Sequence, residues 1–473
     1  MKTLTKRSLV VIALIIFILS VILYLFSPDY YSYIYCNILF ILYLFSSIFV
    51  IHHSLINKNY FNFHVLFLIS FFFVNFIYPV FIYPVSPYYF PVYKYKFNPD
   101  IITKATALAL LGAASYNLGV ILLIRKRDFS NSAINTNFKT LQIILYSLLY
   151  ISFITLLLFG GIGLIKGRFH STAKVPPGLI LIFQIILGLS IMIALYVKSY
   201  KGTTIDFINK FNKPLLPIII MFFLMFLVAG DRGPIIQIVL ISIVSFTLFI
   251  KPIRIKSFIT IVLAGMLFLT IIAYARIQGG KDPSDPGISV SKGLKVFELN
   301  SFYDIGMDLI VNNRNLYTGY EYVNTHGFNY GMSMSFQLLA PFPFLPSLFS
   351  HLIYKSKPDD ITSARILTRD SKASYGLGTN IIIDLYMGFG VIGVVFFMFL
   401  LGLIATTFQW RAHFSDNFSY KIAYVFLVSL AVYLPRSTVM DPLRPIIWAI
   451  ILFKSIQGLR LLLLQLSRKN ELS

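Results

Sequence analysis

Residues 9–26 read LVVIALIIFILSVILYLF, a run of 18 residues without a charged side chain. As an α-helix, a run of this length crosses the roughly 30 Å hydrocarbon core of a bilayer. Similar apolar runs recur along the chain, and the ten-residue alternation of a barrel strand is absent. In lipid such runs must be helical, because only a helix or a closed barrel satisfies every backbone polar group. The sequence therefore predicts an all-α polytopic membrane protein.

The composition supports the same fold class. Of 473 residues, 57% are apolar and 12% are charged, and a soluble domain of this length cannot bury so much apolar surface. The net charge of +22 would suit nucleic acid, but many of the cations flank apolar runs as topology signals, so no nucleic-acid partner is expected. Cys36, the single cysteine, excludes a disulfide framework, a zinc ribbon and an iron–sulfur site. Because the first apolar run lacks a cleavage pattern and precedes further spans, it indicates a retained helix rather than a signal peptide.

About twelve transmembrane helices are predicted, in three regions: helices 1–9 in residues 1–275, an external loop at 276–378, and helices 10–12 in residues 379–473. Lysine and arginine cluster on alternate connecting segments, as at 125–127 and 251–256. By the positive-inside rule, both termini are then cytoplasmic and the long loop is external. The predicted helices lie at about 8–26, 34–52, 65–84, 103–124, 140–160, 178–199, 214–230, 234–250, 257–275, 379–404, 422–434 and 446–464.

The external loop is predicted to be partly helical. Its segments are a helical pattern at about 290–312, an aromatic and glycine-rich stretch at 317–330, an apolar, proline-studded stretch at 332–348 and a short helix at about 360–370. The apolar stretch is expected to be half-embedded in the membrane, and the short helix is expected to be capped by Asp359 or Asp360. No internal repeat is evident, which disfavours transporter folds built from inverted halves.

The sharpest local feature is residues 230–234, GDRGP, at the predicted outer end of the seventh span. A guanidinium near a membrane interface is costly without an anionic or polar partner, and flanking glycines let a ligand approach the backbone closely. Because arginine is well suited to phosphate, Arg232 is a candidate diphosphate ligand. The alternative is a tight helical hairpin in which Arg232 pairs with Asp231 or a lipid headgroup.

Further cations lie on the outer side. Arg365, Arg369 and Lys372 would share one helix face if the short helix continued, and like charges at this spacing repel, so the face would attract an external anion. The alternative is a solvated basic face. Arg276, Arg436 and Arg444 lie near predicted span ends, where they would either converge on a diphosphate or reach to lipid headgroups.

His326 and Asp384 are the candidate bases, and Asp384 lies about a turn inside a predicted span, where an ionisable group is expensive. Either residue alone can equally be a structural hydrogen-bond partner. Tyr320 and Tyr330 are candidates to stack on sugar faces. The chain has no Walker loop, no HExxH and no GxSxG, so no cofactor or metal is expected, and energy for any chemistry must come from an activated substrate.

Two stretches carry a family resemblance. Tyr320 through GFNYGMS at 327–333 to Pro341 and Pro343 is similar to a "YGxS…P" loop segment, and TNIIIDLYMGFGVIG at 379–393 is similar to a helix bearing an acidic residue, a tyrosine and "FGxxG". Together with GDRGP, the predicted spans and the long external loop, they resemble the O-antigen and capsule repeat-unit polymerases of the Wzy type. These belong to the polytopic lipid-carrier-dependent glycosyltransferases. Asp384 stands where the family often has glutamate, one methylene longer.

The resemblance implies a GT-C-like membrane fold in the bacterial cytoplasmic membrane. It also implies transfer of a growing glycan from undecaprenyl diphosphate to the next lipid-linked repeat unit on the outer face. The lipid-linked oligosaccharide and the bilayer are then partners, with a chain-length regulator and a flippase as further expected partners. Such a leaving group needs cationic stabilisation and the acceptor hydroxyl needs a base. The expected anion ligands are Arg232, Arg276, Arg365 and Arg369, followed by Arg436 and Arg444.

Three other functions remain open. An O-antigen ligase shares the architecture and donor but uses another acceptor. A lipid-linked oligosaccharide flippase would be expected to have charged residues in its spans and short outer loops, whereas the predicted spans are nearly free of charge. A non-catalytic envelope scaffold would not need the outer arginines.

Overall fold

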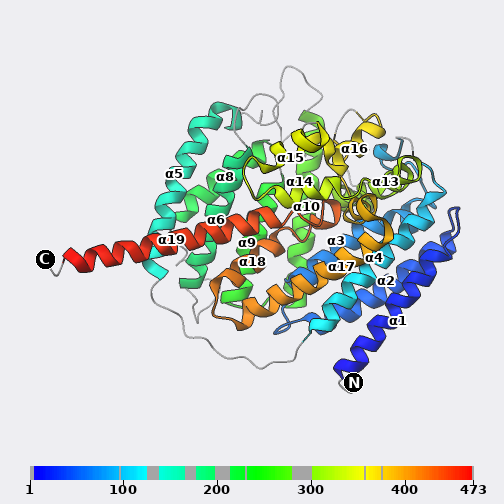
Figure 1. Ribbon diagram of the computed structural model, residues 1–473, viewed down its shortest axis with the longest axis horizontal. Helices are drawn as coiled ribbons and strands as arrows, with labels where there is room; N and C mark the ends of the chain where they lie inside the picture. The colour runs from blue at the N-terminus through cyan, green and yellow to red at the C-terminus, as the bar shows by residue number, and fades with distance from the viewer. Residues whose placement is uncertain are drawn as a thin grey trace.

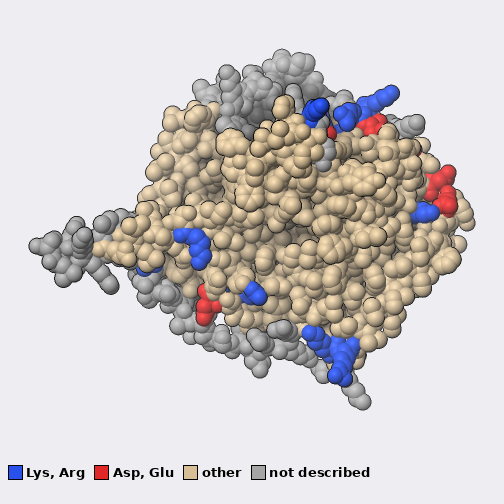
Figure 2. Space-filling view, in the orientation of Figure 1, with Lys and Arg blue, Asp and Glu red and all other residues tan. Residues whose placement is uncertain are grey.

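The computed structural model describes residues 5–94, 97–124, 138–165, 177–197, 213–229, 232–279, 301–355, 358–373 and 376–470. Throughout these ranges the regular structure is helical (Figure 1). The charged side chains that Figure 2 shows lie toward the margins of one face, and its broad centre is free of them among the described residues. A belt of this kind is what a bilayer requires of the protein surface.

Each of the twelve predicted ranges coincides with a helix. These helices are α1 (Lys6–Leu25), α2 (Tyr33–Ser54), α3 (Phe63–Asn75), α4 (Ile101–Leu123), α5 (Phe138–Ile165), α6 (Pro177–Val197), α8 (Leu215–Ala229), α9 (Arg232–Phe249), α10 (Ile255–Gly279), α17 (Ile381–Phe414), α18 (Phe418–Ser429) and α19 (Leu443–Asn470). Within the described ranges, eight helices are long and apolar enough to cross a membrane, while α3, α8, α10 and α18 offer shorter apolar stretches. The all-helical, polytopic class is thus confirmed, and the number of twelve spans stays a prediction.

The third predicted span differs most from its helix. The α-helix α3 ends at Asn75, and a π-helical turn, η1 (Tyr78–Ile82), continues the segment. Pro79 explains the interruption, because proline has no N–H to donate and its ring crowds the preceding turn.

The long helix α17 packs along α4 at the centre of the bundle, with α1 and α2 against the other sides of α4. Two glycines permit the close approach. A Cβ on Gly119 of α4 would lie 2.3 Å from the Phe399 carbonyl oxygen, and a Cβ on Gly402 of α17 would lie 2.3 Å from the Tyr116 carbonyl oxygen. Small residues at such crossings let helix backbones pack directly in a membrane.

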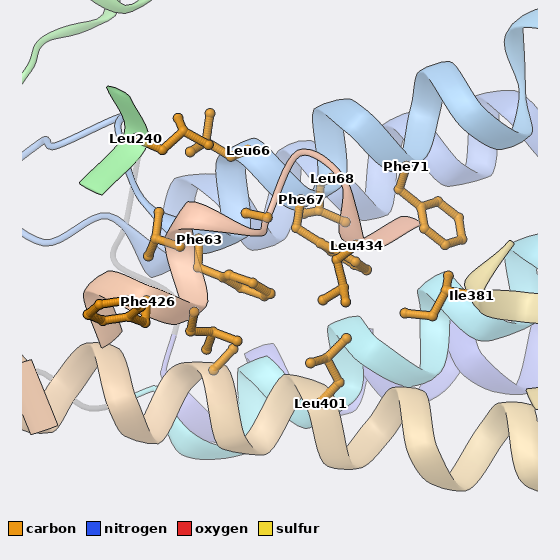
Figure 3. Packing of buried hydrophobic residues seen from close by; sticks show 14 of the residues in the cluster. Phe63, Leu66, Phe67, Leu68, Phe71, Leu240, Ile381, Leu401, Phe426 and Leu434 are labelled. Atoms are coloured by element: carbon orange, nitrogen blue, oxygen red, sulfur yellow. The ribbon is translucent and has the colours of Figure 1, made fainter. Parts of the chain in front are cut away.

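Beside this pair, α3 contributes a row of buried phenylalanines. Figure 3 shows Phe63, Phe67 and Phe71 of α3 among Leu401 of α17 and Leu434, which lies beyond α18. The helix α17 is therefore packed against α3 as well as α4, and Asp384 lies on its first turn.

Short helices fill the described part of the segment between α10 and α17, which the sequence predicts to be external. They are η3 (Phe302–Gly306), α12 (Met307–Ile310), α13 (Asn313–His326), α14 (Met332–Leu339), α15 (Leu345–Tyr354), η4 (Pro358–Ile361) and α16 (Ser363–Asp370). The helix α13 packs against α4 and α17, so the segment rests on the bundle near the start of α17.

Two expectations for this segment need correction. The cap of α16 is Thr362, whose side chain accepts a hydrogen bond from the Arg365 N–H (3.3 Å), and not Asp359 or Asp360. A threonine hydroxyl directly before the helix reaches this N–H, whereas the aspartates lie in the preceding turn. Lys372 lies beyond the end of α16 with φ +50°, so it does not continue the face of Arg365 and Arg369.

The helical pattern predicted at 290–312 is seen only in part. Its second half forms η3 and α12, and residues 290–300 lie outside the described residues. The aromatic stretch that begins at Tyr317 is helical as far as His326, and Gly327 with φ +79° ends that helix.

Candidate functional site

Asp384 lies fully buried on the first turn of α17. Its Oδ1 accepts a hydrogen bond of 2.8 Å from the hydroxyl of Ser333, at the start of α14. Ser333 ends the GFNYGMS stretch and Asp384 lies in the TNIIIDLYMGFGVIG stretch, so the structure joins the two segments that the sequence singled out.

The contact extends along both segments. The Asn329 N–H donates to the Met387 carbonyl oxygen (2.8 Å). Gly331, with φ +77°, lies so close to the Phe389 ring that a Cβ there would be 2.4 Å from it. Since only glycine combines this φ with this lack of a side chain, the loop is fixed on α17 by backbone geometry.

The second oxygen of Asp384 differs from the first in its hydrogen bonding. Asp384 Oδ2 is buried and has no hydrogen-bond partner among the described residues. Ser363 lies beside the carboxylate, and its hydroxyl donates to Thr379 Oγ1 (2.9 Å). Leaving a buried acceptor unpaired costs about 1–3 kcal/mol, so a ligand hydroxyl at this oxygen would be stabilised.

A second carboxylate, Asp441, lies within electrostatic range of Asp384. The Thr438 hydroxyl donates to Asp441 Oδ1 (3.2 Å) and also contacts Gln337 of α14. Burial raises the pKa of Asp441 above its usual range, in spite of hydrogen bonds from Ser437 and Thr438. The loop between α18 and α19 thus closes one side of the site.

An arginine pair lies on a common carboxylate. Arg232 Nη2, at the start of α9, is 3.0 Å from Asp308 Oδ1, and Arg436 Nη1, at the end of η5 (Leu434–Arg436), is 2.8 Å from Asp308 Oδ2. Arg436 Nη1 also donates to the Asp308 carbonyl oxygen (2.7 Å). Two guanidinium groups therefore share one carboxylate from α12.

These three side chains are largely withdrawn from solvent, with exposed fractions of 14% for Arg232, 25% for Asp308 and 26% for Arg436. Burial alone would lower the pKa of Arg436, but the Asp308 carboxylate outweighs burial and raises it. A cavity of about 60 Å³ borders the group and is lined in part by Arg232, Thr270 and Asp304. This cavity is too small for a sugar.

A chain of polar residues connects the arginine pair with Asp384. With its amide oxygen turned toward the guanidinium, Asn312 lies 3.2 Å from Arg436 Nε, and its nitrogen then donates to the Thr379 carbonyl oxygen. Thr379 accepts from Ser363, which lies beside Asp384. The two halves of the site are thus parts of one network.

Buried asparagines hold this network in place. Asn380 caps α17 through the Ile382 N–H (2.9 Å), and its amide donates to Asn75 Oδ1 of α3 (2.9 Å). The amide of Asn315 donates to the Leu377 carbonyl oxygen (2.8 Å). Because buried amides are costly unless they are hydrogen-bonded, these contacts fix the segment that leads into α17.

Several predicted site residues lie apart from this network. His326 is exposed at the end of α13, stacked on Tyr322 with ring centroids 4.4 Å apart. Arg365 is exposed on α16 and lies 3.8 Å from Asp360, and Arg369 is exposed on the same helix. Figure 2 shows basic side chains gathered over the region that Figure 1 labels α16. These three residues face solvent rather than the buried carboxylate.

The two aromatic candidates differ in their exposure. The Tyr320 ring is buried and stacks on Tyr386 at 4.8 Å, so that face is already occupied within the protein. The Tyr330 side chain is 82% exposed and remains accessible to a glycan.

The last two arginines belong to long helices. Arg444 of α19 lies over the Trp448 ring (4.5 Å), and the Trp448 indole donates to the Pro341 carbonyl oxygen (2.6 Å) of the loop motif. Arg276 lies in α10, and its side chain is outside the described residues, as are Gly230 and Asp231. Among the residues that are described, no three His, Cys, Asp or Glu side chains gather as metal ligands would.

Sequence reasoning missed Asp308, Ser333 and Ser363. Asp308 is one of several acids in the external segment, and nothing in its local pattern marks it as the partner of residues 76 and 128 positions away. Ser333 could have been identified, since it is the serine of the quoted loop motif. Its contact with Asp384, 51 positions along the chain, has no local signal.

A family model described as O-antigen polysaccharide polymerase Wzy matches residues 9–465. No curated protein and no solved structure matches the chain. The matched range contains the arginine pair, Asp308, Ser333 and Asp384.

Proposed function

Because the chain belongs to the O-antigen polysaccharide polymerase Wzy family and is thus a repeat-unit polymerase of the inner membrane, we propose a specific reaction for it. It transfers the growing glycan from undecaprenyl diphosphate to a hydroxyl of the next lipid-linked repeat unit. The reaction takes place on the outer face of the membrane. Both termini are cytoplasmic. Twelve helices cross the membrane in two regions, 1–275 and 379–473, and an external region at 276–378 lies between these two regions.

The observation that carries the proposal is Asp308 held between Arg232 and Arg436, on the same network as Asp384. In this reaction the bond between the sugar anomeric carbon and the phosphate oxygen breaks, and negative charge develops on the diphosphate. Two pre-positioned guanidinium groups stabilise such charge most strongly where water is excluded. Asp308 keeps them in place until the diphosphate displaces it.

Asp384 is the proposed base. Its Oδ1 is held by Ser333, and its buried Oδ2 is available to an acceptor hydroxyl. As the new bond forms between the acceptor oxygen and the anomeric carbon, the hydroxyl proton passes to Asp384 Oδ2. A positioned general base contributes typically 10²–10⁴-fold to rate. The shorter aspartate is compatible with this role because Ser333 holds one oxygen of the carboxylate directly.

The exposed candidates are then expected to bind the glycan rather than to act on the bond that breaks. His326, Tyr330, Arg365 and Arg369 lie on the outer segment, where the incoming repeat unit approaches. Tyr330 supplies an open aromatic face, and the two arginines suit acidic sugars. A chain-length regulator and a flippase are further proposed partners.

Gene deletion followed by gel analysis of the surface glycan tests the proposed reaction. Loss of a polymerase leaves single repeat units, loss of a ligase leaves long chains on the lipid carrier, and loss of a flippase traps units inside. Purified protein with lipid-linked repeat units as the only substrate should then release undecaprenyl diphosphate as chains lengthen. Chain growth without this release would rule out the proposed donor chemistry.

A further inference from the structure

A groove of about 500 Å³ opens between α1, α4 and α17. Its walls include Phe17 and Val21 of α1, Leu118 of α4, and Ile392, Val395 and Phe396 of α17. Sites for organic ligands are commonly concave and about 300–1,000 Å³ in volume, so the groove is large enough for an extended hydrocarbon chain.

The groove faces the membrane. Its three helices are each long and apolar enough to cross a bilayer. Ile392 and Phe396 remain 81% and 56% exposed at its opening, where hydrocarbon and not water surrounds a spanning helix. The ligand that fits it is therefore an apolar chain that enters from the bilayer.

The outer end of the groove coincides with a break in α17. Phe389 (φ −141°, ψ 19°) and Gly390 (φ 62°, ψ −154°) depart from helical geometry directly before the groove-lining Val391 and Ile392. The conformation of Gly390 is essentially restricted to glycine, and such positions gather at ligand sites because the surrounding structure must enforce them. A Cβ on Gly390 would lie 3.1 Å from the Phe328 ring of the external segment.

Aromatic side chains connect the groove with the proposed site. Tyr24 lines the groove, and its hydroxyl lies 3.3 Å from that of Tyr320. Tyr320 stacks on Tyr386, which is two residues from Asp384. A lipid whose tail filled the groove would thus have its head group beneath the external segment and near the buried carboxylate.

We propose that this groove binds the polyisoprenoid tail of a lipid-linked substrate. The inference rests on the proposed function, which requires a sugar on a lipid carrier to reach Asp384. A membrane phospholipid has no such requirement, so its acyl chain is not the proposed occupant. The tail fixes the height and direction of the carrier in the membrane, and the groove therefore positions the sugar before any sugar contact is made.

Photolabelling tests the assignment without polymerisation. The probe is undecaprenyl phosphate with a diazirine on its tail, added to the full-length protein in bilayers of phosphatidylethanolamine and phosphatidylglycerol. After irradiation, labelled residues are expected on α1, α4 and α17 along the groove. Excess undecaprenyl phosphate should suppress the labelling, and excess phosphatidylglycerol should not.

The matched variants are Ile392→Trp, inside the groove, and Ile48→Trp, an isoleucine of α2 that is 63% exposed and does not line the groove. Ile392→Trp should lower the labelling by about tenfold, because the indole takes the volume that the tail needs, while Ile48→Trp should leave it unchanged. If Ile392→Trp does not fold, the positions of the labelled residues in the wild-type protein alone decide whether the tail binds in the groove.

Labelling elsewhere on the protein, or equal suppression by phosphatidylglycerol, would overturn the assignment even where chain growth is normal. Conversely, labelling of the groove together with a ligase or flippase phenotype on deletion would support the groove and reject the polymerase reaction. The two failures are therefore distinguishable.

Discussion

The hydroxyl of Ser333 donates a 2.8 Å hydrogen bond to Oδ1 of the fully buried Asp384. This contact holds one oxygen of the carboxylate, while the other oxygen is buried without a hydrogen-bond partner among the described residues. It also joins the loop stretch that ends at Ser333 to the helix stretch that contains Asp384. The predictions below follow from this contact, from the arginine pair and from the fit of the loop on α17.

Asp384→Asn should abolish chain growth while the protein level stays normal. Asparagine keeps the volume and can still accept from Ser333, but it cannot take the acceptor proton, so a loss of about a hundredfold or more is expected. The rate of chain growth with purified lipid-linked repeat units is the measurement. Ser333→Ala should lose less, since the base remains. A polymerising Asp384→Asn variant would assign the proton transfer to another residue.

Arg232→Ala should give single repeat units on the surface with a normal protein level. Arg232→Lys should restore only part of the chain length, because a point charge replaces the fork that holds one Asp308 oxygen and reaches a phosphate. Gel analysis of the surface glycan in a complemented deletion strain is the measurement. Wild-type chain length in Arg232→Ala would remove this arginine from the diphosphate site.

Asp308→Asn should lower thermal stability as well as activity, since Arg232 and Arg436 would lie together without a shared carboxylate. Breaking a buried ion pair typically costs about 3–5 kcal/mol, and the partial exposure of this group places the expected loss below that range. The melting temperature of the purified protein is the measurement.

Asp29→Asn is the control for that experiment. Asp29 forms a 2.7 Å ion pair with Lys104, but its side chain is 83% exposed. Exposed ion pairs contribute typically 0–1 kcal/mol, so its melting temperature should hardly change. An equal effect of the two variants would show that the arginine pair is no more important to folding than a surface contact.

Asp441 predicts a pH dependence of stability. Its pKa is raised in the folded protein by burial, so the folded state binds a proton more tightly than the unfolded state. Stability contributed by this group is therefore fully present below its unfolded pKa and falls as pH rises through the window between the unfolded and folded pKa values. Asp441→Asn should raise the melting temperature at pH 7 relative to wild type and leave a smaller difference at pH 4. A lower melting temperature of the variant at pH 7 would contradict the sign.

The sequence predicted much of the scaffold and less of the site. Apolar runs long enough to cross a bilayer are local signals, so all twelve helix ranges coincide with helices. The cap of α16 was placed on an aspartate instead of Thr362, because several capping residues stand in a row and only the folded backbone selects one. Asp384 and Arg232 stood out as charges at costly positions. Asp308 did not, because its role exists only once α9, α12 and η5 have come together.

Two glycines allow the docking of the loop on α17 to be tested against a control. Gly331 and Gly327 both have positive φ, +77° and +79°, but their ψ values are 16° and −174°. Gly331 is left-handed, whereas the conformation of Gly327 is essentially restricted to glycine, so alanine costs more backbone strain at Gly327. The surroundings differ: a Cβ on Gly331 would lie 2.4 Å from the Phe389 ring, whereas a Cβ on Gly327 meets nothing within 4 Å. In Gly331→Ala either the Phe389 ring or the loop has to shift, and we expect the loop to move away from α17 and pull Ser333 from Asp384.

Gly331→Ala should therefore stop chain growth, and Gly327→Ala should reduce it less, although its backbone strain is greater. Backbone strain at the left-handed Gly331 costs about 1–2 kcal/mol, which is less than the strain at Gly327, so a greater loss in Gly331→Ala reports the contact with Phe389. Chain length on gels and the protein level in the membrane are the measurements, and Gly331→Ala combined with Phe389→Ala should recover part of the chain length by making room for the new methyl group. Equal chain lengths in the two single variants would mean that the position of Ser333 over Asp384 does not limit polymerisation.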